Sequence, residues 1–175
     1  MDELTEVFTA ATRDVGSEYF QLKIDGGDPI YRERVYCYEL YHRMRVRWPE
    51  STEYYLNGEV DKAAHPILRR MGVGREKPDL LVHKPGYMSG NFAIIEVKSA
   101  RSDNAGIYKD LCTLRLFLAQ VGYRRAIYLH FGFDNDDIVS RVEQIASSFE
   151  KLPPIELWVH SRPGEAANIA STLVR

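Results

Sequence analysis

Two apolar segments of the sequence carry charged residues at positions that a buried strand accommodates only with compensation. The segment 78–84 (PDLLVHK) has Asp79 near its start, and the segment 91–99 (NFAIIEVKS) has Glu96 and Lys98 near its end. Moving a carboxylate or an ammonium group out of water is costly unless the charge is paired. These three residues are therefore the first candidates for chemistry.

The spacing of the two segments predicts that their charges meet. Side chains alternate between the faces of a strand, so Glu96 and Lys98 share one face. A Pro-Gly pair at 85–86 indicates a turn, and antiparallel pairing across it brings Asp79 beside Glu96. Two adjacent carboxylates raise each other's pKa or require a cation. Oxygen ligands without a Cys or His cluster favour a hard ion such as Mg²⁺.

A purely structural interpretation of these charges is also open. In it the strand ends reach solvent and the charged side chains form an ion-pair network. Two secondary candidates have the same two interpretations. His83 shares the predicted face of Asp79, although a lone strand histidine is more often structural, and Glu59 with Lys62 near it fits a surface ion pair as well as a site.

The elements that must position these residues follow from hydrophobic periodicity. We predict helices over 2–14, 31–47, 103–121 and 136–150, and strands over 53–60, 78–84, 91–99, 126–131 and 155–160. A turn is expected at 26–29, a short helix within 61–77 and a helical tail from Glu165. The helix between the third and fourth strands implies a crossover and hence a parallel pair. An α/β sandwich with a central mixed sheet follows.

Composition limits the class of protein. The chain has 175 residues, 45% of them hydrophobic, and a net charge of -2, which fits one globular domain over 1–175 and excludes disorder and a wholly basic surface. No apolar run approaches the ~20 residues of a membrane span. The two cysteines lack metal-site spacing. The first residues, MDELTEVFTA, do not resemble a secretory signal, so we expect a cytoplasmic protein that does not bind membranes.

The pair Pro78-Asp79 followed by Glu96-Val97-Lys98, in the order helix, three strands, helix, strand, resembles the PD-(D/E)xK nuclease superfamily. The resemblance implies a restriction-endonuclease-like three-layer sandwich, with an αβββαβ core at about 31–132 and an extra helix and strand. The family adds a carboxylate from the first core helix, for which Glu33 and Glu39 are candidates. We prefer Glu39, because ELYHRMR (39–45) is similar to the helical Glu motif of uncharacterised members.

The function that this resemblance implies is a Mg²⁺-dependent deoxyribonuclease, with Mn²⁺ able to substitute. The metal ligands would be Asp79, Glu96, the Val97 carbonyl and Glu39, directly or through water. Lys98 would orient the attacking water and neutralise the negative charge that develops on the phosphate. The catalytic residues would therefore be Asp79, Glu96, Lys98 and Glu39, and the product a 5′-phosphate.

DNA is the partner that the resemblance implies. Arg43, Arg45 and Arg47 on the helix of Glu39, with Arg101 after the second charged segment, are candidate phosphate contacts. A homodimer would allow both strands of a duplex to be cut. The alternative function is a nuclease-fold module without catalysis, which binds nucleic acid or serves in an assembly.

Overall fold

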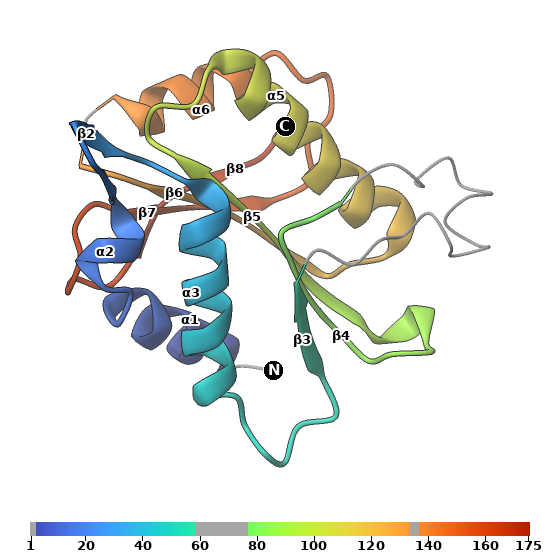
Figure 1. Ribbon diagram of the computed structural model, residues 1–175. Coiled ribbons are helices and arrows are strands. Elements are labelled where there is room, and N and C mark those ends of the chain that lie inside the picture. Colours follow the sequence, from blue (N-terminus) through green and yellow to red (C-terminus); the bar gives the residue numbers. More distant parts are fainter. Residues whose placement is uncertain (1–2, 59–76, 134–136) are drawn as a thin grey trace.

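The computed structural model describes residues 3–58, 77–133 and 137–175, and Figure 1 shows helices on both faces of a central sheet. One face carries α1 (Glu3–Arg13) and α3 (Glu33–Val46), and the other carries α5 (Asn104–Leu116) and α6 (Ile138–Ala146). Each helix buries an apolar stripe against the sheet, as layered folds require. The predicted α/β sandwich with a central mixed sheet is confirmed.

Among the described residues, the sheet has six strands in the order β3-β4-β5-β6-β7-β8. Their bounds are β3 (Tyr55–Gly58), β4 (Leu80–His83), β5 (Asn91–Ser99), β6 (Arg125–Phe131), β7 (Ile155–His160) and β8 (Asn168–Leu173). The pairs β5–β6 and β6–β7 are parallel, and the other three are antiparallel. The helices α5 and α6 make the two crossovers that parallel pairing needs. The predicted crossover after the third strand is thus confirmed, and a second follows it.

The register between β4 and β5 decides which charges meet. Leu80 lies opposite Ile95 in an antiparallel pair, and the turn between the strands contains the short 3₁₀ helix η1 (Met88–Gly90). One step beyond this pair, Asp79 faces Glu96. The predicted antiparallel pairing of the two charged segments is therefore confirmed.

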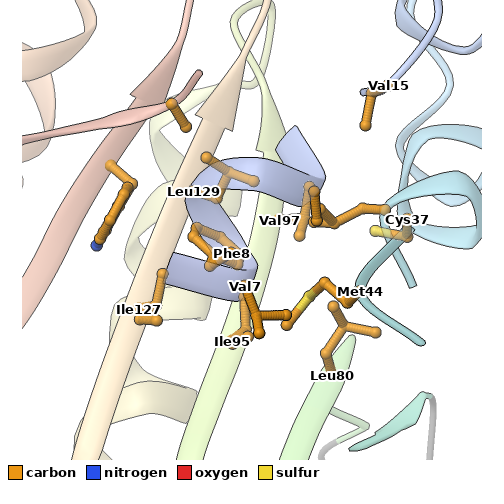
Figure 2. Close-up of a cluster of buried hydrophobic side chains, with 14 of the residues drawn as sticks. Val7, Phe8, Val15, Cys37, Met44, Leu80, Ile95, Val97, Ile127 and Leu129 are labelled. Atoms are coloured by element: carbon orange, nitrogen blue, oxygen red, sulfur yellow. The ribbon is translucent and has the colours of Figure 1, made fainter. Parts of the chain in front are cut away.

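Both faces of the sheet are covered, which accounts for the long apolar run in β5. Figure 2 shows the core on the α1 side, where Phe8 packs with Ile95. Ile94 belongs to the second core, formed with α5 and α6. Because consecutive residues of a strand point to opposite faces, Glu96 and Lys98 point to the same side as Ile94, toward α5.

The structure differs from the sequence-based prediction at the two ends of the chain. The tail from Glu165 was predicted as a helix, but residues 168–173 form strand β8, which pairs with β7. Before α3, the helix α2 (Ser17–Phe20) and a hairpin of β1 (Leu22–Ile24) and β2 (Gly27–Ile30) replace the single predicted turn. The turn of this hairpin uses Gly26 at φ 72°, a conformation that favours glycine.

Two smaller observations complete the fold. The long predicted helix over 103–121 ends in a π-helical turn, η2 (Phe117–Val121). The helix predicted within 61–77 falls almost wholly outside the described residues. Within the described part of the chain, no helix combines the length and the apolar character needed to cross a bilayer.

Candidate active site

Asp79 and Glu96 lie together at the start of β4, where Asp79 comes directly before the first strand residue, Leu80. The Asp79 carboxylate accepts a hydrogen bond from the Val97 backbone N–H, with 2.8 Å between Oδ2 and N. It also forms a hydrogen bond with the carboxyl group of Glu96, a residue that is only 7% exposed. Asp79 thus lies one position before the first paired residue of β4, opposite Glu96 of β5. Its carboxyl group faces that of Glu96.

The two carboxyl groups compete for one proton. Burial raises the pKa of Glu96 well above its ordinary value, and the charges of Asp79 and Asp110 raise it further. Burial also raises the pKa of Asp79, to about 6, although its hydrogen bonds to Val97 and Glu96 oppose the shift. Because both pKa values are raised by burial, at least one of the two acids is favoured in its protonated form.

Lys98 lies on the same face as Glu96 and is held by two other acids. Its Nζ is 3.1 Å from Oδ2 of Asp110 on α5 and 3.4 Å from Oε2 of Glu33 on α3. Burial opposes the charge of Lys98, but Asp110 and Glu33 outweigh burial and raise its pKa above the ordinary value. Lys98 is therefore a fixed ammonium group beside the carboxyl pair.

The acids that hold Lys98 are themselves anchored. Glu33 Oε1 accepts hydrogen bonds from the backbone N–H and the hydroxyl of Ser99, at 3.1 and 3.2 Å. Asp110 Oδ2 accepts one from the Tyr128 hydroxyl at 3.2 Å. These contacts join α3, β5, α5 and β6, and the position of Lys98 is set from two sides.

Glu39, the helix carboxylate preferred from sequence, lies elsewhere on α3. It is buried and pairs with Arg43, with 2.5 Å between Oε1 and Nε. Six residues at about 100° each place it about 120° around the helix axis from Glu33. The structure therefore brings Glu33, the candidate that we did not prefer, into contact with Lys98, and it places Glu39 in an ion pair on the other flank of the helix.

The two secondary candidates, His83 and Glu59, are not found at the carboxyl pair in the described structure. His83 contacts Asn57, with 2.8 Å between Nε2 and Oδ1. It is four strand residues, or about 13 Å, from Asp79. Glu59 is outside the described residues.

The four arginines predicted to contact DNA also differ in their surroundings. Arg43 pairs with Glu39 and Arg47 with Asp14, whereas Arg45 is exposed on α3. Arg101 is exposed and lies over the ring of Tyr31, 5.6 Å from the ring centroid.

The roles of Glu33 and Asp110 as partners of Lys98 were not predicted, although the sequence holds a signal for each. Glu33 is one turn before Cys37 on the same stripe of α3, so the apolar stripe extended backward leads to it. Asp110 interrupts the apolar stripe of α5 three residues after Ile107 and is 6% exposed. A carboxylate within an apolar helical stripe needs a partner in the core, and Lys98 is that partner.

The donor atoms of the carboxyl pair fit a hard, oxygen-binding cation. The Val97 N–H points toward the β4 side of β5, and the carbonyl of the same strand residue points to that side too. Asp79, Glu96 and this carbonyl therefore converge, and a cation would replace the proton that the two acids now share. In the described ranges, no three His, Cys, Asp or Glu side chains are grouped closely enough to hold a metal ion.

A cavity of about 350 Å³ opens beside Asp79, between α3 and the ends of β3 and β4. It is mainly apolar, and its lining residues are Cys37, Tyr38, Tyr41, Asn57, Gly58, Asp79 and Leu80. Asp79 is thus shared by the carboxyl pair and the cavity wall. A ligand in the cavity would therefore lie next to Asp79.

Comparisons with models of protein families, with curated proteins and with solved structures find no significant match for this chain.

Proposed function

We propose that the protein is a Mg²⁺-dependent deoxyribonuclease that hydrolyses phosphodiester bonds. The observation that carries this proposal is the contact between the carboxyl group of Asp79, just before β4, and that of the buried Glu96 on β5. Two acids that must share a proton form a costly arrangement in a core, and a divalent cation removes the cost by letting both ionise. The ammonium of Lys98 follows on the same face of β5.

The residues that would hold the cation are Asp79, Glu96 and the Val97 carbonyl. When bound, a divalent cation supplies Lewis acidity toward a phosphate and lowers the pKa of a coordinated water. The chain contributes the position of these oxygens, which the β4–β5 register and the hydrogen bond from Val97 N–H to Asp79 fix.

Lys98 acts in this proposal as a charge and as a donor. Since Asp110 and Glu33 keep it protonated, it donates hydrogen bonds and is not the base that takes a proton from water. A fixed ammonium group stabilises the negative charge that develops as a nucleophile adds to phosphorus. The role that the resemblance gives to Lys98, orienting water and neutralising charge, is compatible with this protonation state.

The order of elements supports a restriction-endonuclease-like core. The helix α3, the strands β3, β4 and β5, the helix α5 and the strand β6 follow one another as αβββαβ. This order, with the acids on β4 and β5, is what the PD-(D/E)xK resemblance implies. In place of Glu39 we assign the helix carboxylate to Glu33, as a positioning residue for Lys98.

The test is cleavage of single-stranded, duplex and branched DNA with Mg²⁺, with Mn²⁺ and with a chelator. We expect metal-dependent cleavage that Asp79→Asn and Lys98→Ala each abolish, while Glu39→Gln, a matched change of another buried acid, retains it. Titration calorimetry should show Mg²⁺ or Mn²⁺ binding to the wild type and not to Asp79→Asn. Full activity in Asp79→Asn would falsify the proposal, and DNA binding without any cleavage would favour a non-catalytic module.

A further inference from the structure

The cavity beside Asp79 has aromatic walls on its helix side. Tyr38 and Tyr41 of α3 both line it, and Asp79 lines it at the opposite side. Tyr38 is 60% exposed at this position. An exposed aromatic ring at the rim of an apolar cavity offers a flat face for stacking, since its burial by a ligand is favourable and its place on a helix keeps it ordered.

The space between the Tyr41 ring and the backbone of Asp79 depends on Gly58. The Tyr41 hydroxyl donates to the Leu56 carbonyl at 3.4 Å, which ties its ring to β3. A Cβ placed at Gly58 would lie 3.9 Å from the Tyr41 ring and 3.6 Å from the Asp79 carbonyl oxygen. A larger side chain at position 58 would therefore fill the gap between the Tyr41 ring and the backbone of Asp79.

Cations flank the aromatic residues on the same stripe of the helix. Arg34, Tyr38, Tyr41 and Arg45 follow at spacings of four, three and four residues, which places them along one side of α3. Both arginines are exposed. The stripe extends for about 16 Å. Two aromatic rings between two cations suit a nucleic acid strand, whose bases stack on rings and whose phosphates bind cations.

The size of the cavity limits what it holds. At about 350 Å³ it is at the lower end of the roughly 300–1,000 Å³ range of ligand pockets. One base with its sugar matches this space. A paired base within a duplex cannot enter such a cavity without leaving the stack, which costs unpairing and unstacking energy.

Resting on the proposed nuclease function, we infer that this cavity binds one unpaired base of single-stranded DNA, stacked on Tyr38, next to the phosphodiester at Asp79 and Glu96. The preferred substrate is then a single strand or an unpaired end. The mainly apolar lining and the arginines on both sides of the two tyrosines favour this occupant over an uncharged small molecule.

The first experiment measures binding apart from cleavage. A single-stranded oligonucleotide with 2-aminopurine, and the same sequence as a blunt duplex, are titrated with the full chain in a chelator. We expect a change in 2-aminopurine fluorescence with the single strand. Tyr38→Ala should weaken single-strand binding about fivefold or more, Tyr38→Phe should retain it, and duplex binding should not change. Tyr87→Ala, which removes another tyrosine, 63% exposed and outside the cavity, is the matched control.

A second variant tests the cavity without touching an aromatic ring. Gly58→Leu fills the gap beside Tyr41 and should weaken single-strand binding, whereas Gly58→Ala, whose contacts remain at ordinary distances, should have a smaller effect. A circular dichroism spectrum and an unfolding curve for each variant show whether its fold is kept. If Gly58→Leu does not fold, the comparison of Tyr38→Ala with Tyr38→Phe and Tyr87→Ala still shows whether a base stacks on Tyr38.

The failure of this inference differs from the failure of the proposed function. Metal-dependent cleavage that is equally fast on blunt duplex and single strand, with no effect of Tyr38→Ala, overturns the base site and leaves the nuclease. Single-strand binding that depends on Tyr38, with no cleavage in any metal, overturns the nuclease and supports the base site.

Discussion

Lys98 on β5 and Asp110 on α5 form an ion pair across the interface of strand and helix, with 3.1 Å between Nζ and Oδ2. Asp110 is 6% exposed and lies on a helix face that is otherwise apolar. Removing one partner of such a pair leaves a buried charge uncompensated, which costs more than the pair contributes when intact. The same lysine is thus needed for the fold and, in our proposal, for the chemistry.

A double-mutant cycle separates these two roles. Lys98→Ala should destabilise the protein by about 2–4 kcal/mol, somewhat below the loss for a fully buried pair because the lysine side chain is 19% exposed. Lys98→Ala combined with Asp110→Asn should recover much of that stability, since the more deeply buried of the two carboxylates that lose Lys98 is also removed. Urea unfolding measures the change, and Lys109→Ala, on the exposed side of the same helix, is the control. Cleavage should stay absent in the double variant; recovery of activity together with stability would assign Lys98 a structural role alone.

The stability of the metal-free protein should depend on Asp79. Because the folded state raises the pKa of this acid from 3.8 to about 6, the native protein holds the proton more tightly than the unfolded chain does. The free energy of unfolding therefore falls as pH rises from about 4 to above 6, by up to about 3 kcal/mol. In a chelator at pH 8, Asp79→Asn should be more stable than the wild type, and the difference should vanish near pH 4.

The pH dependence of the wild type alone does not isolate Asp79. Asp79 lowers the free energy of unfolding as pH rises, whereas two buried histidines lower it as pH falls. Burial lowers the pKa of His130 to about 3 and that of His160 to about 4, so their contribution is lost as pH falls below about 6.5. Subtracting the unfolding curve of Asp79→Asn from that of the wild type removes this shared background. Addition of Mg²⁺ at pH 8 should stabilise the wild type and not Asp79→Asn. Equal stabilisation of both proteins would place any bound metal elsewhere.

The two carboxylates of α3 should have different importance for activity. Glu33→Gln removes a charge that holds Lys98 and should slow DNA cleavage about tenfold or more, since small displacements of a reacting group are costly. Glu39→Gln weakens only the pair with Arg43 and should leave the cleavage rate near that of the wild type. Initial rates at saturating Mg²⁺ measure the difference. The reverse result would restore Glu39 as the helix carboxylate of the site.

DNA affinity should respond to Arg45 more than to Arg43. Each phosphate contact releases counterions, so log K falls with log salt with a slope of about -0.9 per contact on a duplex and -0.7 on a single strand. Arg45→Ala should reduce that slope by about one contact. Arg43→Ala should change it little, because Glu39 already neutralises this arginine. Fluorescence anisotropy over a range of NaCl concentrations tests both, and identical slopes for the two variants would contradict the expected DNA path along α3.

Sequence patterns predicted the central part of the fold well, for physical reasons. The bounds of β5 and β7 agree with the predicted 91–99 and 155–160, since both are apolar runs bounded by polar residues or proline. The tail was predicted wrongly, because residues 168–173 are mostly exposed and their strand depends on pairing with β7. Local propensity does not report such long-range pairing.

The candidate site was predictable where one turn determines it. Asp79 and Glu96 meet because a single turn sets the register of β4 and β5. The acids around Lys98 come from α3 and α5, and their approach depends on how each helix is rotated against the sheet. The helical periodicity of the sequence does not tell whether Glu33 or Glu39 faces the site.

The charged network joins five separate elements, from Glu33 on α3 to Tyr128 on β6, and β4 and β5 hold its central members. No fragment that ends before β6 contains all of it. Catalytic competence should therefore emerge in one step with global folding, and halves of the chain expressed separately should be inert until they reassociate.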